Sequence, residues 1–151
     1  MADTSILFVE TRSSEQRLLL CRWVEQLVEQ GWKVQVAADS TASAQQLNAM
    51  LWTFSDRSFV PHRIHGESGA PPLSGEATIT SGETVVAGCE VLVVDGSVQL
   101  DFLKHFIWVI HFVLMDDEER RQESRLMWQA ARDEGLVARH VPYGAKIQTL
   151  R

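Results

Sequence analysis

Arginines surround a tryptophan on one side of the last long helix that the sequence predicts. At 100° per residue, Arg125, Trp128 and Arg132 fall within about 60° of one another, and Arg121 lies one turn before Arg125. The opposite side is apolar and is expected to face the core, with Leu126, Met127 and Ala130. Guanidinium groups beside an aromatic wall suit an acidic peptide that carries an apolar end group. In the alternative interpretation, Trp128 covers the chain that follows Gly135.

A second pair of aromatic residues departs from the core pattern in the middle of the chain. On a helix predicted over residues 42–54, Trp52 lies about a quarter turn from the apolar stripe, and Phe59 follows in a loop bounded by Pro61. Large aromatic residues without catalytic groups nearby are typical anchors for a protein partner. The alternative is a satellite hydrophobic cluster beneath the loop.

Motifs of nucleotide-binding and hydrolytic enzymes are absent from the sequence. No GxGxxG turn follows the first predicted strand, no GxxxxGK[ST] loop occurs, and no serine lies in a GxSxG motif. His62 and His65 could hold a metal with Cys89, but no carboxylate stands at a supporting spacing, so we expect ordinary loop histidines. The acidic run 116–119 suits the capping of a helix. We expect no catalytic residue, no metal and no cofactor.

Length and composition indicate one globular domain spanning residues 1–151. The chain has a mass of 17.0 kDa, with 45% hydrophobic and 23% charged residues. No apolar run is long enough to cross a membrane and no secretory leader is recognisable, so we expect a cytoplasmic protein without membrane contact. The net charge of −6 argues against direct binding of nucleic acid. We expect Cys21 and Cys89 to be buried thiols, and His111 to be a hydrogen-bonded core residue.

Hydrophobic periodicity predicts strands that alternate with helices. The predicted strands cover residues 5–10, 32–38, 90–94 and 106–114, with a short edge strand near 76–80. The predicted helices cover residues 14–30, 42–54, 99–105 and 116–134, two of them ending at Gly31 and Gly135. This alternation predicts an α/β fold, a three-layer α/β/α domain with a mainly parallel sheet. A long connection is expected over residues 55–83.

In these same residues the chain resembles the chi subunit family of bacterial DNA polymerase III. Leu51-Trp52, followed by Ser58-Phe59-Val60-Pro61-His62, is similar to the family's tryptophan at a helix end and its SFVPH-like stretch. The length, the order of elements and the basic last helix also agree. The resemblance implies an α/β/α clamp-loader accessory without enzymatic activity, linking the psi subunit to the C-terminal tail of single-stranded-DNA-binding protein.

The resemblance also assigns residues to two surfaces. The psi-binding side, which is thought also to receive a helicase, would use Trp52 and Phe59, with Val60 and Pro61 in the same segment. The tail-binding side would use Arg121, Arg125 and Trp128, where the family usually has a lysine, an arginine and a tyrosine at this spacing. Residues 136–151 differ from the family, so no role is carried over to them.

Two functions of different classes follow from these observations. An interaction adaptor explains both sets of displaced aromatic residues and the missing phosphate-binding loop. The alternative is a small α/β enzyme or nucleotide-binding protein with its site at the carboxyl ends of the strands. Asp95-Gly96, directly after a predicted strand, is the best candidate for such a site, although a turn is the more common role of this pair.

Overall fold

Seven parallel strands form one sheet in the computed structural model, which describes residues 3–66 and 71–151. The sheet order is β3-β4-β2-β5-β6-β1-β7, and every neighbouring pair is parallel. The elements in chain order are β1 (Ser5–Thr11), α1 (Gln16–Glu29), β2 (Lys33–Ala38), α2 (Thr41–Thr53), β3 (His62–Ile64), β4 (Glu76–Ser81), β5 (Val91–Asp95), α3 (Leu100–Leu103), β6 (Trp108–Leu114), α4 (Glu118–Asp133) and β7 (Val137–Val141). Among the described helices, none combines the length and the apolar character needed to cross a membrane.

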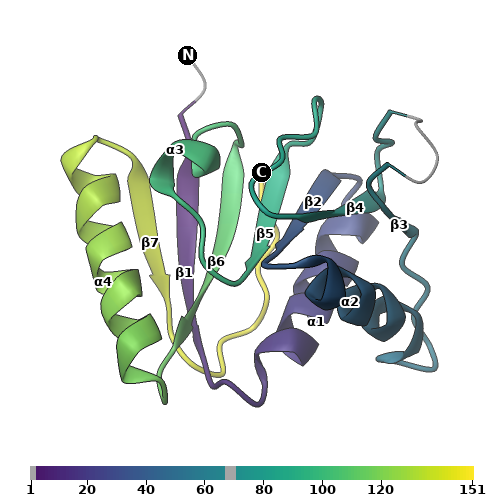
Figure 1. Cartoon of the computed structure of the whole chain (residues 1–151), viewed down its shortest axis with the longest axis horizontal. Helices are drawn as coiled ribbons and strands as arrows, with labels where there is room; N and C mark the ends of the chain where they lie inside the picture. Colours follow the sequence, from purple (N-terminus) through teal and green to yellow (C-terminus); the bar gives the residue numbers. More distant parts are fainter. Residues whose placement is uncertain (1–2, 67–70) are drawn as a thin grey trace.

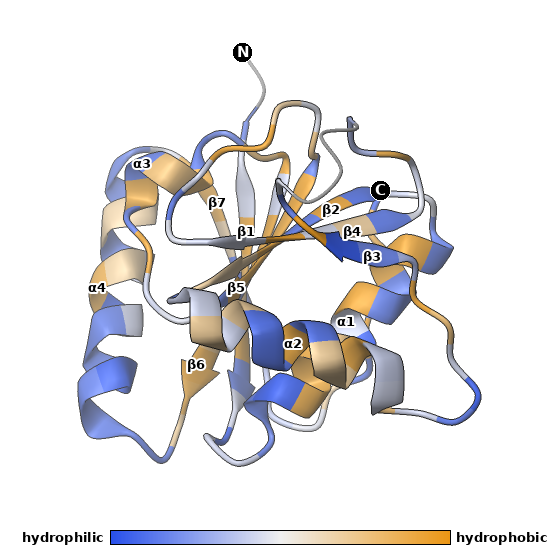
Figure 2. Cartoon of the chain, turned by 45° about the vertical axis from the view of Figure 1, so that its right-hand side comes forward, coloured by the Kyte–Doolittle hydropathy of each residue, from blue (hydrophilic) through white to orange (hydrophobic). Residues whose placement is uncertain are grey.

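Helices cover both faces of this sheet, which confirms the predicted three-layer α/β/α arrangement (Figure 1). One hydrophobic cluster joins α1 and α2 to one face, and a second joins α3 and α4 to the other. The central strands are coloured as hydrophobic in Figure 2, whereas much of α4 is hydrophilic. A parallel sheet has this pattern because its strands are buried on both sides, while each covering helix keeps one side in water.

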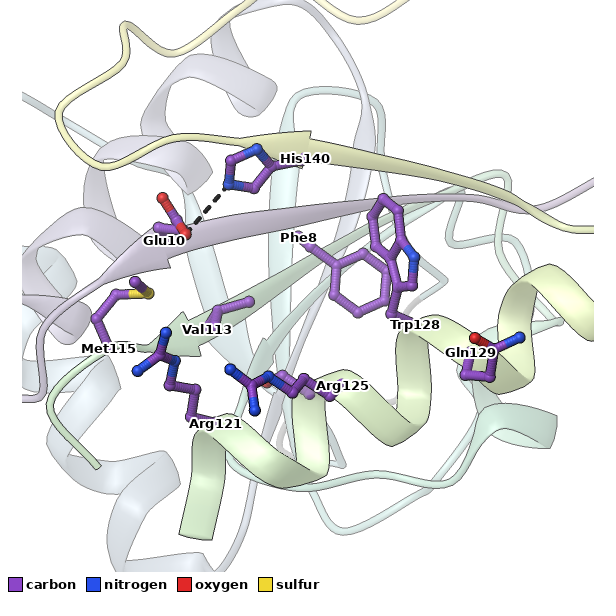
Figure 3. A pocket seen from close by; sticks show the side chains of 10 residues that line it. Phe8, Glu10, Val113, Met115, Arg121, Arg125, Trp128, Gln129 and His140 are labelled. Atoms are coloured by element: carbon purple, nitrogen blue, oxygen red, sulfur yellow. Dashed lines mark ion pairs between the residues drawn. The ribbon is translucent and has the colours of Figure 1, made fainter. Parts of the chain in front are cut away.

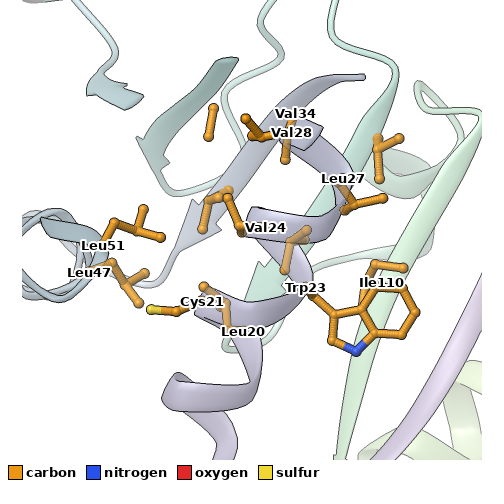
Figure 4. Packing of buried hydrophobic residues seen from close by; sticks show 14 of the residues in the cluster. Leu20, Cys21, Trp23, Val24, Leu27, Val28, Val34, Leu47, Leu51 and Ile110 are labelled. Atoms are coloured by element: carbon orange, nitrogen blue, oxygen red, sulfur yellow. The ribbon is translucent and has the colours of Figure 1, made fainter. Parts of the chain in front are cut away.

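Packing of α1 supplies the larger cluster (Figure 4). Leu20, Trp23, Val24 and Leu27 recur at three- and four-residue intervals, so they share one side of the helix and are all buried against the sheet and α2. Burial of each such side chain contributes about 1.5–3 kcal/mol to folding. This packing holds α1 and α2 on the same face of the sheet.

The predicted helix ends are confirmed. Gly31 and Gly135 follow α1 and α4 with φ angles of 89° and 77°, a backbone region that glycine adopts without strain. The side chain of Ser40 accepts a hydrogen bond from the Ser43 amide at the start of α2. At the start of α4, Asp117 accepts one from the Arg120 amide, so the acidic run 116–119 does contain the helix cap.

Three strands differ from the sequence prediction. The segment predicted near 76–80 forms β4, which lies inside the sheet between β2 and β3 and is not an edge. Of its buried threonines, Thr80 is accommodated there because Gln35 donates a hydrogen bond to its hydroxyl at 3.1 Å. The edge strands are β3 and β7, neither of which was predicted. Residues 67–70 of the predicted connection lie outside the described residues.

His111 attaches α4 to the sheet. It lies on β6, only 8% exposed, and its Nε2 is 2.9 Å from the Ser124 hydroxyl on α4. This confirms the expected hydrogen-bonded core histidine. Burial, with a smaller contribution from the charge of Arg120, lowers the pKa of His111 from 6.5 to about 4. The imidazole is therefore neutral in the folded protein at neutral pH.

We expect the low pKa of His111 to make stability depend on pH. Because the folded pKa is depressed to about 4, the unfolded chain binds a proton first as the pH falls below 6.5, and stability declines toward pH 4. Urea unfolding measures the free energy of unfolding at about pH 7 and at about pH 4.5. Between these two pH values, wild type should lose about 2–3 kcal/mol more of this free energy than His111→Gln. Carboxylates titrate in both proteins, so an equal loss in the two would contradict this role for His111.

Candidate functional site

A pocket lies between the middle turns of α4 and the carboxyl-terminal parts of three strands (Figure 3). Its volume is about 440 Å³. We call it the arginine–tryptophan pocket, and its lining residues are Phe8, Glu10, Val113, Met115, Arg121, Ser124, Arg125, Trp128, Gln129 and His140. The pocket contains all three residues that the family resemblance assigned to a tail-binding surface. Their presence in one pocket follows from helical spacing, because Arg121, Arg125 and Trp128 are successive neighbours along one side of α4.

Strand β1 supplies the floor of the pocket. Side chains alternate between the two faces of a strand, so Phe8 and Glu10 share the face that α4 covers. In the parallel register, Phe8 is level with His140 on β7, and Glu10 is level with Val113 on β6. The pocket is therefore built on three adjacent strands, one of which was not predicted.

One end of the pocket is aromatic. The rings of Trp128 and Phe8 meet edge to face, with centroids 5.0 Å apart and an interplanar angle of 71°. The Arg132 guanidinium lies 5.9 Å from the centroid of the Trp128 ring. Trp128 is only partly buried, in the cluster that also receives Leu136 from the chain after Gly135. The indole thus packs against the same hydrophobic cluster as Leu136 and also forms a pocket wall.

The other end of the pocket carries charge that is not neutralised on the helix side. Among the described residues, neither Arg121 nor Arg125 forms an ion pair, whereas the neighbouring Arg120 pairs with Glu123 at 3.4 Å. On the strand side, Nε2 of His140 lies 3.2 Å from a carboxylate oxygen of Glu10. The pocket therefore combines free guanidinium groups with an aromatic wall.

The orientation of α4 differs from the prediction in one respect. Leu126, expected in the core, is 64% exposed, while the small residues Ser124 and Ala131 are the buried ones. Small side chains let the helix approach the sheet closely, so they, and not the largest apolar residues, mark its inner side. The partly buried Trp128 and the exposed Arg125 therefore lie at the flank of the buried stripe and border the pocket.

A second candidate surface lies on α2 and the loop that leads to β3. Trp52 is 53% exposed and Phe59 is 70% exposed, with ring centroids 5.8 Å apart. The ring of His62 lies 4.6 Å from that of Trp52. We call these three residues the aromatic patch. The sequence correctly placed Trp52 off the apolar stripe, which consists of the buried residues Ala44, Leu47 and Leu51.

Two of the residues assigned to this surface hold the segment in place. Val60 is 1% exposed and belongs to the main hydrophobic cluster, so its side chain offers no surface to a partner, contrary to its assignment. Pro61 is partly buried, and its carbonyl accepts a hydrogen bond from the Ala77 amide at 2.9 Å. His62 fixes the other side of the segment, with Nε2 3.1 Å from the Asn48 carbonyl oxygen. Phe59 is thus exposed on a segment with buried neighbours.

The two surfaces lie at opposite edges of the sheet. The aromatic patch adjoins β3 and the arginine–tryptophan pocket adjoins β7, the first and last strands in the sheet order. Six strand intervals separate these edges, a distance of roughly 29 Å at the usual strand spacing. The two surfaces therefore share no residue.

The carboxyl ends of the central strands hold an ion pair. Arg17 of α1 lies 3.3 Å from the buried Asp95 at the end of β5. Gly96 follows with a φ of 120°, and a side chain there would collide with the Asp39 carboxylate. The pair Asp95-Gly96 therefore forms a bend beside a small crevice of about 140 Å³. Within the described ranges, no group of three or more histidine, cysteine or acidic side chains is placed to hold a metal.

The two cysteines are buried and unpaired, as predicted. Burial is the largest influence on both thiols, raising the pKa of Cys21 to about 12 and that of Cys89 to about 11. A thiol becomes a nucleophile only as the thiolate, so neither cysteine is activated for chemistry.

Comparison with known proteins gives a consistent result. The sequence model of the family described as "DNA polymerase III chi subunit, HolC" matches residues 4–139. The chain is also similar to the DNA polymerase III subunit chi of Haemophilus influenzae, with 26% identity over 124 residues that cover 81% of this chain and 85% of that protein. The matched region stops within β7 and includes the aromatic patch and every described lining residue of the arginine–tryptophan pocket except His140.

Exposure of the aromatic patch predicts different effects for two adjacent substitutions. Phe59→Ala removes a 70% exposed ring and should change the free energy of unfolding by no more than about 0.5 kcal/mol. Val60→Ala removes methyl groups from the core and should cost about 1–3 kcal/mol. Chemical denaturation of the two variants measures both values. A large loss for Phe59→Ala would show that the ring supports the fold.

Proposed function

This chain belongs to the DNA polymerase III chi subunit family, and on that premise we propose that it is a non-catalytic, cytoplasmic adaptor of the clamp loader. Membership of the family makes it an accessory subunit in DNA replication. In the proposed role, one surface binds the psi subunit and the other binds the C-terminal tail of single-stranded-DNA-binding protein. The observation that carries the proposal is the pocket that unites unpaired Arg121 and Arg125 with Trp128.

The chemistry of the arginine–tryptophan pocket suits an acidic tail with an apolar end group. Arg121 and Arg125 would hold carboxylates, and the end group would lie against Trp128 and Phe8 at the aromatic end. Charge-assisted hydrogen bonds at a partly exposed site contribute about 1–2 kcal/mol each, so an isolated tail should bind in the micromolar range. Salt should weaken this binding because the guanidinium groups face solvent.

The aromatic patch suits the psi subunit. Trp52 and Phe59 present a large apolar area, and their backbone is fixed by the buried Val60, so little ordering is needed when a partner binds. A helicase is the alternative partner for this same surface. Because the patch and the pocket are separated by the width of the sheet, psi and the tail would bind at the same time.

We expect Arg125→Ala to weaken tail binding by about tenfold or more, since it removes a cation that the ligand neutralises. A titration of the tail peptide by calorimetry at two salt concentrations measures this effect. Trp128→Ala should also weaken binding, through loss of the apolar wall. Arg120→Ala is the matched control, because Arg120 lies on the same helix but pairs with Glu123 and does not line the pocket.

Equal affinities of wild type, Arg125→Ala and Trp128→Ala for the tail peptide would show that this side of α4 is only solvated. The proposal that the pocket binds the tail would then be wrong. An equal loss in Arg120→Ala would point instead to a general effect of net charge.

We expect Phe59→Ala to cost at least about 2 kcal/mol of affinity for the psi subunit while leaving tail affinity unchanged. An exposed ring that becomes buried on binding loses its whole contact area when it is truncated. Val85, which is 44% exposed and lies outside the aromatic patch, provides the control as Val85→Ala. Psi affinity that is the same in wild type and Phe59→Ala would remove the aromatic patch from the proposed interface.

A further inference from the structure

We propose that Glu10 is a specificity-determining residue of the arginine–tryptophan pocket, admitting acidic peptides and excluding phosphate-bearing ligands such as single-stranded nucleic acid. This inference rests on the proposed function of the pocket. It starts from the position of Glu10, the one acidic side chain among the described residues that line the pocket.

Two contacts fix the Glu10 carboxylate on the strand side of the pocket. One oxygen lies 3.2 Å from Nε2 of His140, and the other accepts a hydrogen bond from the Tyr143 amide at 3.2 Å. Both oxygens are thus held by β7 and the turn that follows it, while Arg121 and Arg125 extend from the helix on the other side (Figure 3). The pocket therefore has a positive wall and a wall that carries a fixed carboxylate.

Without Glu10, the pocket would have the features of a single-stranded nucleic acid site. Such sites combine arginines for the backbone phosphates with an aromatic ring on which a base stacks. Arg121, Arg125 and Trp128 provide both, and His140 would add a further donor. In the proposed role the pocket lies near single-stranded DNA, so a strand bound there would compete with the tail.

Glu10 distinguishes the two ligand classes by the spacing of their charges. A nucleic acid carries a charge on every nucleotide, so a strand in the pocket would place phosphate charge close to the carboxylate. A peptide can carry its acidic side chains toward α4 and present neutral backbone to β1. Specificity of this kind comes from a repulsive group that penalises the wrong ligand, added to the attractive groups that hold the right one.

Glu15 allows the charge of Glu10 to be separated from its structural role. Its carboxylate accepts a hydrogen bond from the Tyr143 hydroxyl at 2.8 Å, so both glutamates hold the turn after β7. Glu15 does not line the arginine–tryptophan pocket. Glu15→Gln therefore has the same change in net charge and a similar effect on the turn, without altering the pocket wall.

The test compares wild type, Glu10→Gln and Glu15→Gln in titrations with the tail peptide and with a labelled oligothymidine, each at low and moderate salt. Glu10→Gln should bind oligothymidine at least about threefold more tightly than wild type, with a gain that shrinks as salt rises. Tail affinity should change less, so the preference for the peptide should fall. Glu15→Gln should match wild type with both ligands.

The result that overturns the proposal is an unchanged ratio of peptide to oligothymidine affinity in Glu10→Gln, or an equal change in Glu15→Gln. Thermal melting checks that both variants are folded. The isosteric glutamine at position 10 can still accept a hydrogen bond from the Tyr143 amide. Failure of the proposed function is recognised separately, because wild type would then not bind the tail peptide while the oligothymidine measurement still reports on Glu10.

Discussion

Burial of β1 on both faces is the constraint on which the rest of the structure depends. Leu7 and Val9 pack into the cluster under α1, and Ile6 and Phe8 pack into the cluster under α4. A slip of one residue would exchange the two sets, so the register is fixed by core packing. Glu10 follows Phe8 on the same face, which means that the same constraint places an aromatic ring and a carboxylate in the floor of the pocket. The alternation of side chains along β1 therefore determines both the core packing and the floor of the pocket.

Strong periodicity made most of the fold predictable. Helix α1 repeats its apolar residues regularly, and β5 and β6 are continuous apolar runs, so their positions follow from the sequence. Strand β7 was missed because only the ends of its VARHV segment are clearly apolar, and it forms through pairing with β1 at a distant position in the chain. Pairing between remote segments leaves little local signal.

The candidate surfaces were predictable only where local sequence spacing determines them. Spacing alone brought Arg121, Arg125 and Trp128 together, since helix geometry is local. It could not show that Phe8, Glu10 and His140 complete the pocket, because they arrive on separate strands. Leu126 misled the prediction because its apolar character says nothing about how closely α4 approaches the sheet. Val60 sits beside the exposed Phe59, and only tertiary packing separates their roles.

The two surfaces lie at the two edges of one stiff sheet, and this fixed distance sets the local concentration, at the pocket, of any ligand segment attached to a partner at the aromatic patch. A partner held at the aromatic patch is confined to within roughly 30 Å of the pocket. Confinement in a volume of that radius corresponds to an effective concentration on the order of 10 mM. A tail that binds with micromolar affinity would then be almost fully engaged whenever its parent protein is tethered nearby. Weak binding at the pocket is therefore compatible with firm attachment in an assembly and with rapid release outside it.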